Sequence, residues 1–223
     1  MEGRSLASLS DMLRLLSDVH ITDQEDVWQW NIGSNGVFSV ADMRRRIDDK
    51  VLPSTGMKTR WCRMIPKKVN IFIWRSLLNK VPCRVALSSK GMELVSISGP
   101  ICGGSTESIR HLFSECHVAA VLWELVFRWV QVSPRAVLGP KEVLDWVDVC
   151  HLSSTKKSIL EVVTYTTLWV IWRYRNDVVH EARLMRKETL FDTVREFSFL
   201  WFFNRSKSVS INWTVWLQNP LDV

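Results

Sequence analysis

Apolar side chains recur every three or four residues along most of this chain, which is the spacing of helices that bury one face. The pattern predicts helices over residues 5–19 and 40–50. A third helix is expected over residues 66–78, because Pro66 suits a first helical turn, where its missing N–H group leaves no bond unmade. The apolar stripe of this third helix comprises Val69, Phe72, Ile73, Trp74, Leu77 and Leu78. A short helix should follow over residues 82–91.

The second half of the chain has the same pattern with broader apolar surfaces. Residues 143–149 predict a short helix, and residues 156–179 predict a long one that Ser153 or Ser154 can cap. Because the long helix is apolar nearly all round, it should form the centre of a helical bundle. A further helix is expected over residues 186–204, followed by a last turn. The residues of this helix expected to face inward are Phe191, Val194, Phe197 and Trp201, and the last turn carries Trp213 and Trp216.

One short region departs from the helical pattern. Residues 27–31 alternate apolar and polar side chains, and residues 37–40 supply a second extended run, with the turn-forming segment 33–36 between them. These features predict a small N-terminal β-hairpin. The expected fold class is therefore mainly α, a helical domain with one small hairpin. The segment 134–140, which holds two prolines and a glycine, indicates a linker to a C-terminal helical region over residues 140–223.

Residues 99–116 contain cysteine and histidine at the spacing of a zinc site. Cys102, His111 and Cys116 follow the pattern C-x8-H-x4-C, and Gly99 stands where a preceding C-x2-C pair would have its first cysteine. The alternative is a pair of buried cysteines and a helical histidine with a local hydrogen bond. His111 and Cys116 lie about 140° apart on an ideal helix, so a shared metal ion requires a distorted turn between them.

Further motifs surround this segment in a fixed order. Residues 36–40 read G-V-F-S-V, residues 66–75 read P-K-K-V-N-I-F-I-W-R, and residues 111–113 read H-L-F. In this combination the chain resembles the reverse transcriptase zinc-binding domain of plant LINE-type retrotransposon polyproteins. The resemblance implies a domain of this kind over residues 20–132.

The same resemblance implies the cofactor and its ligands. Zinc would be held in a knuckle by Cys102, His111 and Cys116. The knuckle is degenerate, because Gly99 offers no side chain at the fourth position, and we therefore expect zinc binding to be weak or lost.

The charge of the chain indicates a polyanionic partner. The formal net charge is +6, and residues 61–100 alone hold seven Lys and Arg residues against Glu93, so this segment accounts for the whole excess. A basic segment of this kind is expected to bind RNA or DNA largely independently of sequence. The alternative is a solvated helix face. The candidate phosphate-binding residues are Lys67, Lys68, Arg75, Lys80 and Arg84.

The sequence offers no evident catalytic centre. Asp48 and Asp49 fall at a predicted helix end rather than on a polymerase hairpin, and no G-x-S-x-G or phosphate-binding glycine loop is present. We therefore expect no enzyme activity from the residues of this chain. The five cysteines are an odd number and no secretory signal precedes them, which favours a reducing intracellular compartment, nucleus or cytoplasm. No apolar run reaches the ~20 residues of a membrane span.

Two functional classes remain open on the sequence. The first is a non-catalytic nucleic-acid-binding accessory region, as in the C-terminal part of a retrotransposon reverse transcriptase. The second is a structural or interaction module, or a decayed retroelement remnant, with no retained activity. In the second class a protein partner or a second copy of the chain would bind the aromatic helix through Phe199, Phe202 and Phe203.

Overall fold

The computed structural model describes residues 2–17, 23, 25, 30, 36–51, 60–132, 139–181, 185–206 and 211–222. It divides the chain into two units, residues 1–57 and residues 58–223. The first unit contains the helices α1 (Glu2–Leu16) and α2 (Val40–Val51), so the helices expected in these two regions are confirmed. On α1, the apolar side chains of Leu9, Leu13 and Leu16 are about half exposed.

The predicted β-hairpin is wrong in the part that the structure describes. Residues 37–39 form a bend and an irregular segment, and the described residues contain no strand. The competing structure is a helix start at Ser39, whose hydroxyl accepts a hydrogen bond from the Asp42 backbone N–H at 3.4 Å. A side-chain cap of this type favours helix over a strand continuing through Val40. Most of the other proposed strand, residues 27–31, lies outside the described residues.

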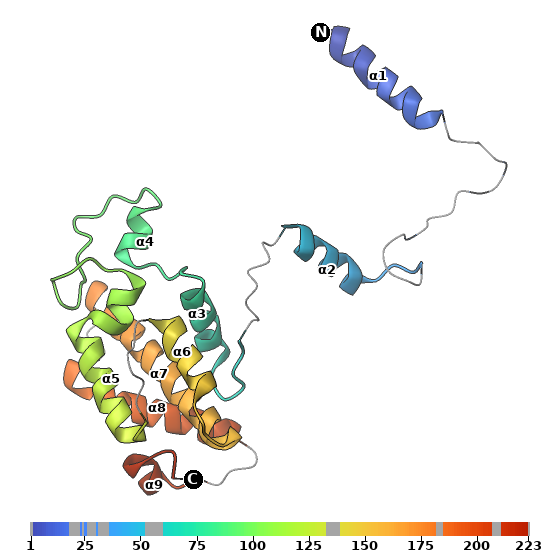
Figure 1. Cartoon of the computed structure of the whole chain (residues 1–223). Coiled ribbons are helices and arrows are strands. Elements are labelled where there is room, and N and C mark those ends of the chain that lie inside the picture. The colour runs from blue at the N-terminus through green and yellow to red at the C-terminus, as the bar shows by residue number, and fades with distance from the viewer. Residues whose placement is uncertain are drawn as a thin grey trace. The chain divides into compact units, whose positions relative to one another are not determined.

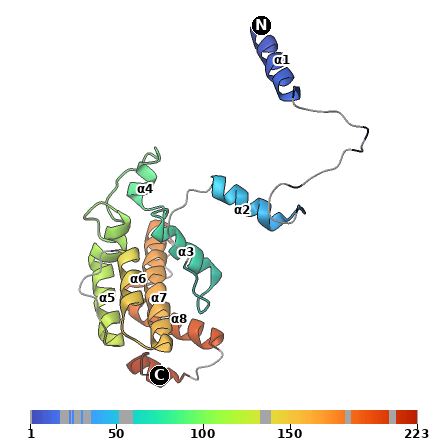
Figure 2. The ribbon, with the colours of Figure 1, turned by 45° about the vertical axis from the view of Figure 1, so that its right-hand side comes forward.

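The second unit is a helical bundle built around α7 (Ser154–Val179). Four helices pack against it, and Figures 1 and 2 show α7 among them: α3 (Lys67–Leu77), α5 (His117–Val130), α6 (Pro140–Val149) and α8 (Leu190–Arg205). The Ser153 hydroxyl caps α7 by accepting a hydrogen bond from the Lys156 backbone N–H. Ten of the twelve residues from Leu160 to Ile171 are buried, which confirms the expected central helix.

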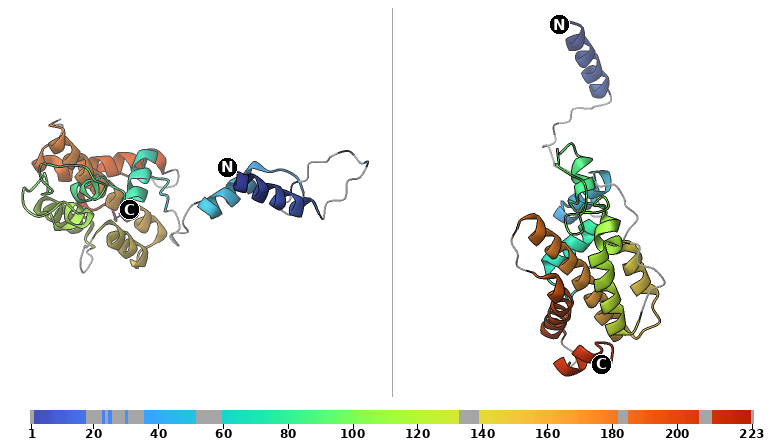
Figure 3. Two further views of the ribbon diagram at one scale, coloured as in Figure 1. Left: turned by 90° about the horizontal axis from the view of Figure 1, so that it is seen from above. Right: turned by 90° about the vertical axis from the view of Figure 1, so that its left-hand side faces the viewer.

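Smaller elements close the bundle. They are α4 (Arg84–Ser88), a π-helical turn η1 (His111–Glu115), a 3₁₀ turn η2 (Lys187–Thr189) and α9 (Trp213–Gln218), and α9 packs against α8 (Figure 3). Trp216 of α9 is fully buried, and its backbone carbonyl accepts a hydrogen bond from the Trp129 indole at 2.9 Å. The expected division into residues 20–132 and 140–223 stays a prediction. Helix α5 belongs to the first of these regions and α7 to the second, and the two helices pack together.

One residue of the predicted α3 stripe does not point into the core. Val69, Phe72 and Ile73 are buried as expected, but Trp74 is 42% exposed. The buried face of α3 is completed by polar residues instead, because the Asn70 side chain exchanges two hydrogen bonds with the backbone of Cys62. None of the described helices is both long and apolar enough to cross a membrane.

Candidate metal centre and basic surface

A tight loop presents the first cysteine of the centre. Ser98 and Thr106 pair in an antiparallel bridge, and the Gly99 N–H donates to the Ser105 carbonyl at 2.9 Å. Inside the loop, Gly103 has a φ of +66°, a conformation that glycine adopts without steric cost. The loop is therefore held at both ends, with Cys102 near its tip.

A π turn places the other two candidate ligands. The Ser108 hydroxyl accepts from the His111 N–H at 3.0 Å, and the Cys116 N–H donates to the His111 carbonyl, five residues back, at 2.7 Å. This five-residue bond brings Cys116 round to the side of His111, which an α-helix would not do. The distorted turn expected from the spacing is confirmed. No single continuous helix runs from His111 to Val130, because Cys116 is extended and α5 begins after it.

The three candidate ligands converge. One donor atom from each of Cys102, His111 and Cys116 lies within 4.8 Å of the others, and the Cys102 Sγ is 3.2 Å from the His111 Nε2. His111 and Cys116 are 7% and 2% exposed. Burial raises the pKa of the Cys116 thiol, so a metal ion must displace a firmly held proton there. Two sulfur donors and one imidazole suit zinc.

The space around Gly99 indicates where a fourth ligand would enter. A Cβ atom built on Gly99 would lie 3.0 Å from the Cys102 Sγ and 3.2 Å from the His111 Nε2. A side chain at this position would thus point directly into the cluster. The residues present fit zinc with three protein ligands, and position 99 is the place from which a fourth side chain would reach the same ion. His117, the next residue after Cys116, is exposed, and its Nε2 lies 3.3 Å from Lys187 Nζ.

A buried ion pair ties this centre to the bundle. Glu107, between the loop and the π turn, is fully buried and receives two hydrogen bonds of 2.8 Å from the guanidinium of Arg175 on α7. Its Oε2 also accepts from the Arg84 backbone N–H at 2.7 Å. Sequence analysis did not identify this pair. Arg175 was the signal that could have revealed it. A charged residue on the buried side of a helix that is apolar nearly all round requires a buried partner.

A second ion-pair cluster, also missed, joins the start of the unit to α6 and α7. Arg60 donates to Glu161 at 2.8 Å and to Asp148 at 2.5 Å. Burial lowers the pKa of Arg60, but the hydrogen bond and charge of Glu161 outweigh it and the net shift is upward. Next to this pair, burial raises the pKa of the Cys62 thiol to about 12.

The five candidate phosphate-binding residues do not share one role. Lys67, Lys68 and Arg75 lie on the exposed side of α3, and Lys80 follows the helix. Arg75 also donates to the Lys80 carbonyl at 3.3 Å. Arg84 is half-buried, and its guanidinium donates to the Ser98 carbonyl at 2.8 Å, which fixes the metal-site loop. The structure thus brings four of the five to one exposed region and places Arg84 in a structural contact.

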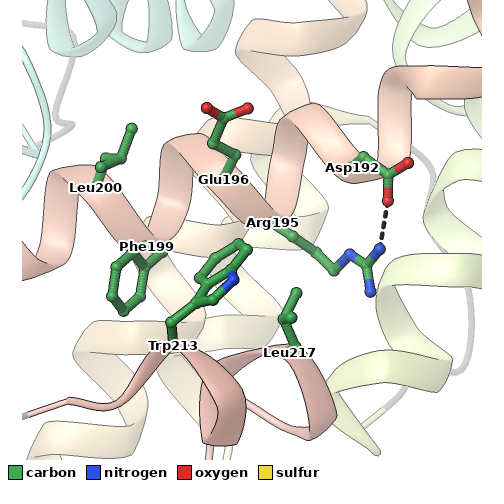
Figure 4. A pocket seen from close by; sticks show the side chains of 7 residues that line it. All are labelled: Asp192, Arg195, Glu196, Phe199, Leu200, Trp213 and Leu217. Atoms are coloured by element: carbon green, nitrogen blue, oxygen red, sulfur yellow. Dashed lines mark hydrogen bonds and ion pairs between the residues drawn. The ribbon is translucent and has the colours of Figure 1, made fainter.

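The aromatic residues considered for a protein partner also separate. Phe202 is buried against Trp216, Phe203 is 52% exposed, and Phe199 packs edge-on against Trp213 with 4.9 Å between ring centroids. A pocket of about 500 Å³ lies between α8 and α9, and in Figure 4 the dashed line within it joins Arg195 to Asp192. The residues around this pocket are Asp192, Arg195, Glu196, Phe199, Leu200, Trp213 and Leu217.

Comparison with known proteins agrees with the metal centre. No curated protein and no solved structure matches the chain. Residues 38–123 match the family described as zinc-binding in reverse transcriptase. The match covers 86 of the 223 residues and contains Cys102, His111 and Cys116. The segment that carries the candidate metal centre is therefore similar to the accessory zinc-binding region of reverse transcriptases, which is distinct from the polymerase core.

Proposed function

We propose that this chain is a non-catalytic accessory region of a LINE-type retrotransposon reverse transcriptase polyprotein from a plant, and that it binds RNA or DNA with little regard to sequence. The observation that carries the proposal is the set of unpaired cations on and beside α3. Lys67, Lys68 and Lys80 are exposed, and none of them is within ion-pair distance of a carboxylate in the described part of the chain.

Some cations elsewhere on the surface are paired with carboxylates. Arg110 pairs with Glu115 at 2.6 Å, Arg128 with Glu124 at 2.7 Å and Lys141 with Asp145 at 2.7 Å. A cation paired in this way must give up its partner before it binds phosphate. The cations of α3 have no carboxylate partner to give up, and they are therefore available to a nucleic-acid backbone.

The role proposed for zinc is structural. Cys102, His111 and Cys116 would hold the loop and the π turn together, and Arg84 and Glu107 connect that loop to α4 and α7. With three ligands the site is expected to bind zinc weakly. The bundle supplies a core without it, so folding should not depend on the metal.

Charge reversal tests the proposal. In a variant with Lys67, Lys68 and Arg75 all changed to Glu, affinity for a nucleic acid should fall and its salt dependence should flatten, by about 0.7 to 0.9 units of slope for each phosphate that the protein no longer neutralises. The matched control changes Arg186, Lys187 and Arg205 to Glu. These exposed residues lie outside the basic segment 61–100, and the change in net charge is the same. Equal effects of the two variants would show that only net charge matters and would contradict the proposed surface.

The second candidate is a structural remnant without nucleic-acid binding, and Gly99 favours it because the fourth ligand is lacking. Absence of measurable binding to single-stranded or duplex nucleic acid at low salt, by a folded protein, would support this candidate over the first.

A further inference from the structure

The exposed face of α3 combines cations with apolar side chains. At about 100° per residue, Trp74, Lys67, Ile71, Arg75 and Lys68 lie in this order across an arc of about 120°. Ile71 and Trp74 are 47% and 42% exposed, so the middle and one edge of this arc are apolar. This face therefore presents an indole and an isoleucine to solvent beside three cations.

A small pocket adjoins one edge of this face. It has a volume of about 190 Å³, lies between α3 and α7, and is lined by Lys68, Ile71, Phe72, Arg75, Val81, Pro82 and Trp172. Both charged residues of the lining are cations. Lys68 Nζ also lies 5.7 Å from the centre of the Trp169 ring of α7, so this cation of the lining already contacts an aromatic ring.

We propose that this face of α3 binds single-stranded nucleic acid, with one base stacked on the indole of Trp74 and neighbouring phosphates held by Lys67, Lys68 and Arg75. The inference rests on the proposed function and names the form of nucleic acid that this surface takes. Proteins that bind single strands without sequence preference combine a cationic track with aromatic stacking platforms, and this surface has both.

The side chains of the same face argue against a role in contacting base edges in the major groove of a duplex. A helix that reads the major groove needs polar side chains that reach base edges, such as Arg, Asn or Gln. Of these types, the exposed arc of α3 offers only Arg75, because its middle is Ile71 and Asn70 is buried in its bond with Cys62. Paired bases are stacked inside a duplex and cannot lie on Trp74, whereas bases of a single strand can.

The pocket between α8 and α9 provides a matched control. Trp213 is 39% exposed, close to the value for Trp74, but its pocket is lined by Asp192 and Glu196 against the single cation Arg195. A phosphate backbone is not attracted to such a lining. Trp213→Ala therefore removes an equally exposed indole from a surface without a cationic track.

The test measures the affinity of the full chain for a 12-nucleotide oligo-dT, a 12-nucleotide oligo-U and a duplex hairpin, by fluorescence anisotropy. Trp74→Ala should weaken single-strand binding about tenfold with an unchanged salt slope, because base stacking on an aromatic side chain contributes about 1–3 kcal/mol. Trp74→Phe should retain most of the affinity, and Trp213→Ala should leave it unchanged. A loss with either oligo-dT or oligo-U supports the proposal, and the comparison tells which sugar is preferred.

Two results would overturn the inference: Trp74→Ala no weaker than Trp213→Ala, or an equal loss for the hairpin. Far-ultraviolet circular dichroism and melting establish that each variant is folded, and Trp74→Phe retains an aromatic ring should the alanine variant unfold. If the triple Glu variant of α3 loses binding while Trp74→Ala does not, only the stacking inference fails. If neither change affects binding, the proposed function fails as well.

Discussion

A cysteine at position 99 should make the chain less stable than the unchanged protein without zinc, and more stable than it with zinc. Without metal, Gly99→Cys places a Cβ atom 3.0 Å from the Cys102 Sγ and 3.2 Å from the His111 Nε2, which is tighter than ordinary packing. Crowding of this kind costs about 1–3 kcal/mol, so the variant should melt below the unchanged protein in a chelator. With zinc the added thiolate completes a tetrahedral site, and the variant should melt above it.

The size of the zinc effect follows from the ligand count. A complete structural site contributes about 10–16 kcal/mol, so one ligand of four contributes about 3 kcal/mol, or about two orders of magnitude in affinity. Competition with a chelating dye measures the zinc affinity. Melting temperatures of both chains, with zinc and with EDTA, show whether their order of stability changes. Gly99→Ser is the matched control, because it crowds the loop similarly but supplies a poor ligand. It should lower the melting temperature in EDTA without gaining zinc affinity.

Equal zinc affinity in the Gly99→Cys and unchanged chains would refute this reasoning. Either another residue already completes the site, or the three donors never converge in solution. Cys102→Ser separates these two cases, since it weakens binding only where the site exists.

The packing of the bundle leads to three further predictions. Glu107→Ala leaves the buried guanidinium of Arg175 unpaired and should cost about 3–5 kcal/mol in urea unfolding; adding Arg175→Met should recover part of that loss, and simple additivity would contradict the pairing. Truncation after Val179 uncovers the face of α7 on which α8 packs and should give aggregated or molten protein; a soluble truncate that unfolds cooperatively would argue against this. Because burial raises the pKa of the Cys62 thiol from its ordinary 9.0 to about 12, that thiol stays neutral in the folded chain. Its contribution to stability is complete below pH 9 and is lost as the pH rises towards 12, at up to about 1.4 kcal/mol per pH unit, and Cys62→Ala should remove this part of the alkaline slope.

Local spacing carried most of the helix prediction. The central helix followed from the Ser153 cap and an unbroken apolar surface, and the ligand triad followed from C-x8-H-x4-C together with the requirement for a distorted turn. These features depend on residues close together in sequence, so one sequence is enough to reveal them.

The errors have the opposite origin. A cap at Ser39 replaces the strand expected at residues 37–40. On α3, Trp74 is exposed, whereas the polar Asn70 is buried and bonds to the backbone of Cys62. The pair of Glu107 and Arg175 joins residues 68 positions apart, and nothing in the local pattern of either one names the other. Long-range pairing of charges is decided by the packing of the whole bundle, which composition and periodicity do not describe.

The position of Arg175 has a consequence for how this chain can be divided. The similarity to the zinc-binding region of reverse transcriptases ends at residue 123, but the partner of Glu107 lies on α7, 52 residues beyond that end. A fragment cut at the border of the similarity would keep every candidate zinc ligand and lose the cation that neutralises the carboxylate between them. The segment that is recognisable by similarity, residues 38–123, is therefore shorter than the segment needed to form the metal centre with its buried ion pair intact.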